Sequence, residues 1–272
     1  MKSLKIYCIS MNPKHLDLIK RLKYEPVGLG DNFFSDEWYN DKSGTNIAFK
    51  NQYYGEYTFH YWLWKNNKIN NEGWLGFCQY RKFWKNINSN INDSSFENLN
   101  NMVLKKIPPE LDKYESILGE PLFVNQLRFS KFIKKNPKKM LLNPSLFFNK
   151  NKRTIKFHFD MMHGEGNLDR AILLLDNDER SDFTHFINTE ISFNPQNMFL
   201  CRKKNILLNY YNSLFPWLAR CETIFEFEKR NIYGLKRIYG FLAERYMSYW
   251  FKKYTKFGIL PIHFKDLSDY LL

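Results

Sequence analysis

The chain lacks several features that mark special classes of protein. Its four cysteines form no CxxC pair, and no apolar run reaches the roughly 18 residues of a membrane span. The apolar stretch at the N-terminus is too short for a secretion signal. These absences argue against a disulfide framework, a zinc cluster and an integral membrane protein, and we expect a cytosolic protein with reduced thiols.

Acidic residues are also scarce, because 28 Asp and Glu face 41 Lys and Arg and leave a net charge of +13. Such a charge favours anionic partners, among them nucleic acid, phosphorylated sugars and acidic lipid headgroups, without choosing among them. A hydrophobic content of 44% with 18% aromatic residues predicts a packed core rather than a disordered chain.

Strand-like and helix-like segments alternate in the first eighty residues. Residues 4–11 and 74–78 are short apolar runs typical of buried strands, and residues 15–23 and 46–66 carry apolar residues at helical spacing. This alternation predicts an α/β fold with an open, mostly parallel sheet flanked by helices. Ligands of such sheets bind at the carboxyl ends of the strands, where the second strand ends in Gln-Tyr-Arg-Lys.

The second half of the chain predicts mainly helices, at residues 168–175, 214–228 and 235–251. Between the two halves, residues 121–159 contain ten Lys or Arg and no Asp or Glu. Apolar residues interleave with these cations, so the segment could face anionic lipid headgroups, with a solvated lysine-rich excursion as the equal alternative.

Five stretches in this order resemble one family: NIAFKNQYYGEYTFHYWLWKN, GWLGFCQYRKFW, HGEGNLDRAILLL, NMFLCRKKNILLNYYNSLFPWLARCE and RIYGFLAERYMSYW. The family is the domain of unknown function 4422, found in bacterial capsular and O-antigen loci. The resemblance implies one GT-A-like glycosyltransferase domain over residues 1–272. Residues 1–120 would bind the nucleotide sugar, 121–159 would be a basic insertion, and 160–272 would supply acceptor contacts and catalysis.

The resemblance also implies a reaction. A sugar, in some members galactofuranose, would pass from a nucleoside diphosphate donor, with UDP expected, to an oligosaccharide or lipid-linked glycan of a surface polysaccharide. The enzyme would be cytoplasmic and could be peripheral on the inner face of the membrane. The alternatives are a basic nucleic-acid-binding protein and a non-catalytic accessory subunit that binds sugar or nucleotide; no nucleic-acid-binding motif favours the first.

The strand end Gln79 to Lys82 is the first candidate for donor binding. Many GT-A enzymes carry Asp-x-Asp at this point to hold a metal ion, whereas here Arg81 and Lys82, with the Tyr80 hydroxyl, could bind diphosphate directly. They could equally be solvated charges at a strand end. Asp176 and Asp178 form the one Asp-x-Asp of the chain, but they follow a helix. We therefore expect no metal cofactor.

Further candidates come from positions that match the family. The donor-binding set is completed by Asn46, Lys50, Asn51, Glu56, His163 and Arg245. Asn46 or Asn51 could instead cap a helix, and His163 could be an ordinary loop histidine. A metal site from the ligand types around His163 fits no strong spacing signature.

Inversion at an anomeric carbon needs a carboxylate that deprotonates the acceptor hydroxyl. The matched positions offer Asp169, Glu222 and Glu244. Asp169 follows a glycine-rich loop and is slightly preferred, while Glu222 lies in an aromatic helix where a carboxylate must be paired or functional. Glu244 adjoins Arg245, so a structural ion pair is its alternative role.

Overall fold

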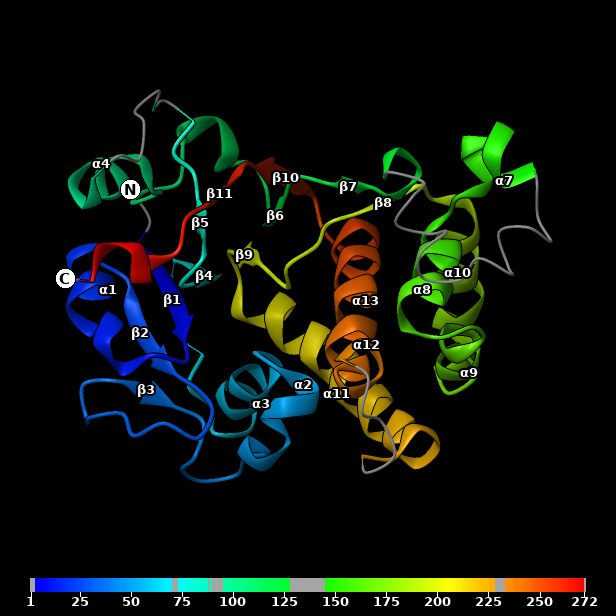
Figure 1. Cartoon of the computed structure of the whole chain (residues 1–272), viewed down its shortest axis with the longest axis horizontal. Helices are drawn as coiled ribbons and strands as arrows, with labels where there is room; N and C mark the ends of the chain where they lie inside the picture. Colours follow the sequence, from blue (N-terminus) through cyan, green and yellow to red (C-terminus); the bar gives the residue numbers. More distant parts are fainter. Residues whose placement is uncertain are drawn as a thin grey trace.

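A computed structural model of the chain describes residues 3–69, 73–87, 89, 95–127, 145–227 and 233–271. Its centre is a mixed, mostly parallel sheet with helices on both faces, which confirms the α/β prediction (Figure 1). The strands follow the spatial order β10 (Phe257–Leu260), β6 (Ser116–Gly119), β9 (Phe199–Cys201), β4 (Trp74–Gln79), β1 (Leu4–Ser10), β2 (Glu25–Gly28) and β3 (Tyr39–Asn40).

Strands β4, β1, β2 and β3 are parallel, so their carboxyl ends meet at one edge. Strand β4 turns directly into β5 (Lys82–Trp84), which pairs with β11 (Ile262–Phe264) near the C-terminus. Strand β9 runs antiparallel between β4 and β6, and the pairs of β5 with β4 and with β11 are also antiparallel. Separately, β7 (Leu122–Phe123) pairs with β8 (Ser192–Phe193).

Side chains of β1 alternate between two hydrophobic clusters, as the period of a strand requires. Ile6 and Cys8 face α1 (Leu16–Arg21) and α4 (Phe96–Met102), whereas Tyr7 and Ile9 face the larger cluster with α3 (Tyr57–Lys65), α11 (Lys204–Phe225) and α13 (Ile238–Tyr254). All four cysteines are free and buried, in agreement with the expectation of reduced thiols.

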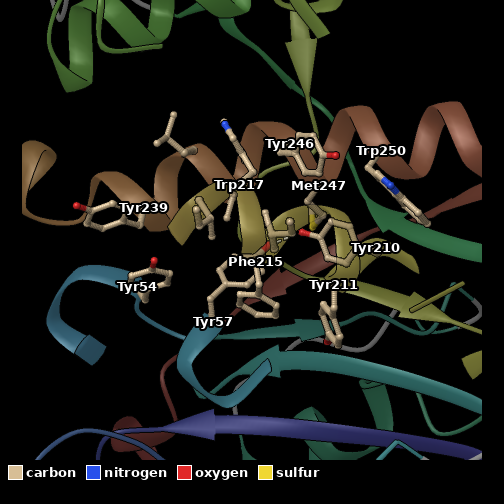
Figure 2. Close-up of a cluster of buried hydrophobic side chains, with 14 of the residues drawn as sticks. Tyr54, Tyr57, Tyr210, Tyr211, Phe215, Trp217, Tyr239, Tyr246, Met247 and Trp250 are labelled. Carbon is tan, nitrogen blue, oxygen red and sulfur yellow. Dashed lines mark hydrogen bonds between the residues drawn. The ribbon is translucent and has the colours of Figure 1, made fainter. Parts of the chain in front are cut away.

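Aromatic side chains fill the space between α2 (Asn51–Tyr54), α11 and α13 (Figure 2). The rings of Tyr54 and Tyr239 are stacked 4.9 Å apart, and the fully buried Trp217 donates its Nε1–H to the Ala171 carbonyl. Trp217 therefore belongs to the core and is no platform for a ligand. A Cβ on Gly240 would lie 3.3 Å from the Tyr54 carbonyl oxygen, so this glycine lets α13 approach α2 closely.

A group of helices lies beyond α13, at the right of Figure 1: α8 (Ile155–His163), α9 (Asn167–Ile172) and α10 (Asn177–Thr189). The short helices are α7 (Ser145–Phe148) and α12 (Tyr233–Lys236). None of the helices among the described residues is both long and apolar enough to cross a bilayer. Residues 128–144, the middle part of the predicted basic insertion, lie outside the described residues.

Candidate active site

A cleft of about 570 Å³ opens at the carboxyl ends of β1, β2 and β4. This is the edge at which parallel sheets bind their ligands. The cleft is lined by Ile9, Ser10, Met11, Leu29, Asn51, Gln52, Gly55, Glu56, Gln79, Tyr80, Arg81, Lys82 and Arg237. A smaller hollow of about 150 Å³ shares Glu56, Gln79, Lys82 and Arg237 with it and continues to Gln196, Asn197, Gly240, Phe241 and Glu244.

Glu56 is the centre of a hydrogen-bond network in this cleft. Its Oε1 accepts from Gln79 Nε2 at 3.1 Å and from Asn197 Nδ2 at 2.8 Å, while its Oε2 pairs with Arg237 at 3.3 Å. The Glu56 side chain is only 11% exposed, and these three donors satisfy its buried oxygens. Glu56 thus fixes the polar groups of three distant segments around the end of β4.

Arg237 is a cleft residue that sequence reasoning missed. Its guanidinium lies against Gly55, where an added Cβ would come within 2.1 Å of Arg237 Nη2. Gly55 also has φ of +60° and separates α2 from α3. A glycine inside a helical pattern often marks such a close approach, so Gly55 was the sequence feature that could have indicated this contact.

Lys82 is a largely buried cation beside Glu56. Its Nζ donates to Gln79 Oε1 at 3.0 Å. Burial lowers the pKa of Lys82 below its ordinary value, while Glu56 and Glu244 oppose this shift. Gln79 at the end of β4 links Lys82 to Glu56, because its amide oxygen accepts from Lys82 and its amide nitrogen donates to Glu56.

Arg81 also lines the cleft, but its charge is already balanced. Its Nε forms an ion pair with Asp266 at 2.8 Å, and the guanidinium lies over the Tyr80 ring at 4.6 Å. Asp266 comes from the C-terminal segment after β11, and sequence reasoning missed it. The guanidinium remains 59% exposed, so it can contact a ligand without leaving Asp266.

Glu244 is the candidate base that faces the cleft. Its Oε1 accepts from the Gln196 backbone N–H at 2.6 Å, and its Oε2 pairs with Arg245. The predicted ion pair with Arg245 is therefore present. Arg245 itself is 1% exposed, stacks over Phe193 at 4.2 Å and donates to His158, so it supports α13 from inside the core.

The other candidate base on α11, Glu222, lies in a separate cluster. Lys50 Nζ donates to both of its oxygens at 2.7 Å, and the Tyr54 hydroxyl donates to Oε1 at 2.6 Å. Neither Lys50 nor Glu222 lines the cleft. The sequence left this carboxylate either paired or functional, and these two donors pair it.

The two asparagine candidates make local contacts. Asn46 Oδ1 accepts a hydrogen bond from the Ala48 N–H at 3.2 Å, just before the 3-10 turn Ala48–Lys50, whose N-cap position is Ile47. Asn51 lines the cleft and donates to the Gly55 carbonyl and to Thr58 Oγ1. Asn51 therefore also stabilises the break at which Arg237 approaches.

Asp169 and His163 lie among the helices beyond α13. Asp169 is half exposed and pairs with Lys156 at 2.6 Å, and His163 is buried and stacks 3.9 Å from the Phe241 ring. Neither lines the cleft, although Phe241 does border the smaller hollow. Among the described residues, no group of three or more His, Cys, Asp and Glu is arranged to hold a metal ion.

The Asp-x-Asp sequence has a structural role in the described part of the chain. Asp176 precedes α10 and pairs with Arg220 at 3.2 Å, and Asp178 lies in the first turn of that helix, where acidic residues are favourable. The sequence placed these residues at the end of the preceding helix, and in the structure they lie at the start of α10.

Comparison with known proteins identifies a family and a solved structure of similar fold. Residues 5–255 match the family described as Domain of unknown function (DUF4422). The chain belongs to this family. Its structure is similar to the solved apo structure of the WbbM bifunctional glycosyltransferase, with a TM-score of 0.66 and 21% sequence identity, over 97% of this chain and 45% of the WbbM chain.

At this identity the likeness shows a shared fold, and the DUF4422 chain spans less than half the length of WbbM. No curated protein matches the chain significantly. The fold of the DUF4422 chain is thus an α/β fold of the kind found in a glycosyltransferase, with its cleft where such a sheet binds ligands.

Proposed function

We propose that this DUF4422 chain is a glycosyltransferase that binds a nucleoside diphosphate sugar in the cleft at the end of β4. The observation that carries the proposal is the grouping of three cations, Arg81, Lys82 and Arg237, around one cavity at the carboxyl edge of the sheet. Cations fixed at this edge suit a diphosphate, because guanidinium and ammonium groups donate several charge-assisted hydrogen bonds to phosphate oxygens. The fold shared with WbbM supports the same reading.

The network around Glu56 would organise these cations before the donor arrives. Arg237 and, through Gln79, Lys82 are held by the same carboxylate. Preorganised charges stabilise a leaving diphosphate without rearrangement in the transition state. Burial lowers the pKa of Lys82, and a phosphate bound beside it would favour its charged form.

Glu244 is the base that we propose among the three carboxylates suggested by the sequence, because it lines the hollow next to the cation cluster. An acceptor hydroxyl placed there would lie beside both Glu244 and the donor. The backbone N–H of Gln196 and Arg245 orient the carboxylate. The hydroxyl proton would pass to a Glu244 oxygen as the new glycosidic bond forms and the bond to the diphosphate breaks.

The donor set of the cleft does not fit a divalent metal ion. The end of β4 carries Gln79, Arg81 and Lys82 in place of carboxylates, and both Glu56 and Glu244 are engaged with N–H donors. We therefore propose metal-independent transfer, with UDP as the nucleotide and a surface-polysaccharide glycan as the acceptor. Galactofuranose as the sugar, a lipid-linked acceptor and binding to the inner membrane face are further parts of this proposal that rest on the family resemblance.

Donor binding and hydrolysis test the proposal. Thermal shift with UDP-, GDP-, dTDP- and CMP-sugars should select one nucleotide, and that donor should be hydrolysed or transferred with excess EDTA present. Arg237→Gln should lower turnover about a hundredfold, the usual effect of removing one donor to a developing anion. Lys106→Gln, which removes an exposed cation elsewhere, is the control. Full activity of Arg237→Gln, or activity that EDTA abolishes and Mn²⁺ restores, would contradict the proposal.

A further inference from the structure

A second cavity, of about 240 Å³, lies at the opposite end of the same strands. Residues at the starts of β1, β2 and β4 line it, together with the segment that leads from β9 into α11. Strand β1 has seven residues, so the two cavities are separated by about 20 Å of strand. A ligand in this cavity would not touch the cleft.

Positive charge dominates the lining of this cavity. Its charged residues are the five cations Lys5, Lys23, Arg202, Lys203 and Lys204, with the single acid Glu25. Nearby carboxylates balance three of the cations: Glu25 lies 3.6 Å from Lys5, Asp112 lies 3.9 Å from Arg202, and Glu115 lies 3.1 Å from Lys203.

Lys23 and Lys204 are the cations without such a balance, since neither forms an ion pair or a side-chain hydrogen bond with another described residue. Lys23 moreover adopts φ of +58°, a conformation in which glycine is the common residue. Lys23 is the residue after the C-cap of α1, where the Tyr24 N–H donates to the Ile19 carbonyl and the left-handed conformation ends the helix.

Ile6, Trp74 and Leu207, which are almost completely buried, lie behind the polar lining and belong to the core. The volume equals that of roughly eight water molecules and is smaller than the roughly 300 Å³ at which pockets for drug-sized ligands begin. The cavity is thus large enough for a phosphate or diphosphate group and too small for a whole nucleotide.

We propose that this cavity is a second anion site, distinct from the cleft, that binds a phosphate or diphosphate group through Lys23 and Lys204. The group could belong to a soluble phosphorylated compound or to the headgroup of a lipid. Both sources offer the same oxygens to the two ammonium groups, so the experiment has an arm for each.

Amide NMR separates the two cavities, because Gly73 lines the basic cavity and Gly240 lines the hollow of the cleft. Titration of the full chain with inorganic pyrophosphate should shift the Gly73 amide saturably. In the double variant Lys23→Gln/Lys204→Gln, the Kd measured at Gly73 should rise roughly tenfold or more, because two charge-assisted contacts are lost. The Kd measured at Gly240 should stay unchanged.

The matched control is Lys14→Gln/Lys106→Gln, which removes the same charge from two exposed sites. It should leave the Gly73 titration within about twofold of the wild type, since exposed charges at a distance are screened. An unshifted Gly73 amide, or equal effects of the two double variants, would overturn the proposal. If the cleft does not bind the donor, the Gly240 amide will fail to shift, and the Gly73 titration will be unaffected.

Vesicles identify the source of the phosphate group. Co-sedimentation with phosphatidylcholine vesicles that contain phosphatidic acid, competed by pyrophosphate and lost in Lys23→Gln/Lys204→Gln, would assign the site to a lipid headgroup. A pyrophosphate-dependent shift of Gly73 without such vesicle binding would assign it to a soluble compound. Either result supports the anion site.

Discussion

The cleft and the helical region around α8, α9 and α11 both contain carboxylates in ion pairs, yet only the cleft pairs surround a cavity. Glu56 and Glu244 hold donors that line open space at the ends of parallel strands. Glu222 is closed off by Lys50 and Tyr54, and Asp169 pairs with Lys156 outside the cleft. The residue type and its pairing are the same in both regions, so our proposal assigns function to a carboxylate by its position at the sheet edge.

The largest expected difference between the two regions is in turnover. Glu244→Gln should lower transfer by about a hundredfold or more, the usual contribution of a positioned base, while donor binding is retained. Asp169→Asn should change turnover less than about threefold, because its carboxylate is half exposed and does not line the cleft. Initial rates with a saturating donor measure both. Near-normal turnover of Glu244→Gln together with an inactive Asp169→Asn would reverse the assignment.

The second comparison is between two glycines, Gly55 and Gly166. Gly55 lines the cleft and lies between α2 and α3. A side chain there would meet Arg237 and would also require φ of +60°. With ψ of −136° as well, Gly55 lies in a region essentially restricted to glycine, so Gly55→Ala should cost about 1 to 3 kcal/mol of unfolding free energy and should displace Arg237, lowering turnover roughly tenfold. Gly166→Ala is the matched control: it too has positive φ, at +73°, but nothing lies within 4 Å of its added Cβ. Equal turnover of the two variants would show that the position of Arg237 does not matter.

Much of this arrangement could be predicted from the sequence. Periodicity and the polar end of β4 located the sheet edge, and five of the named candidates line the cleft: Asn51, Glu56, Tyr80, Arg81 and Lys82. A sixth, Glu244, lines the adjoining hollow. The GT-A-like α/β fold was confirmed, including its helical second half.

Contacts between distant segments could not be predicted. Asp266 reaches Arg81 and Arg237 reaches Glu56 across 185 and 181 positions respectively (266 − 81; 237 − 56), and no local pattern encodes such a pairing. Arg245 was expected at the donor and is instead buried beside His158, because a residue on the inner face of α13 cannot be told from one at its cleft end by spacing alone.

The buried His60 makes the stability of the core depend on pH. Burial lowers the pKa of His60 to about 3 from its ordinary value of 6.5. Between these values the unfolded chain binds a proton that the folded chain does not, so stability falls as pH decreases through this window. From pH 7 to pH 5, His60 alone should remove about 2 kcal/mol of unfolding free energy.

Urea unfolding at pH 7 and pH 5 measures this loss. His60→Asn, whose amide can still bond to the Tyr211 hydroxyl, should show a weaker pH dependence than the wild type. The exposed His185 provides the control, because His185→Asn should keep the wild-type dependence. If His60→Asn and His185→Asn lose stability equally on acidification, His60 does not stay neutral in the folded protein.

The smallest expected effect concerns the ion pair between Arg81 and Asp266. The guanidinium is 59% exposed, so the pair contributes little to stability, and its removal should leave unfolding nearly unchanged. Asp266→Asn removes the charge that competes with a diphosphate for Arg81, and donor affinity should rise about two- to threefold, with a steeper dependence on salt. Calorimetric titration with the nucleotide at two salt concentrations measures this change, and Asp269→Asn, which removes a neighbouring exposed carboxylate paired with Lys265, serves as the control. A donor affinity that falls in Asp266→Asn would mean that Asp266 holds Arg81 in the binding geometry rather than competing for its charge.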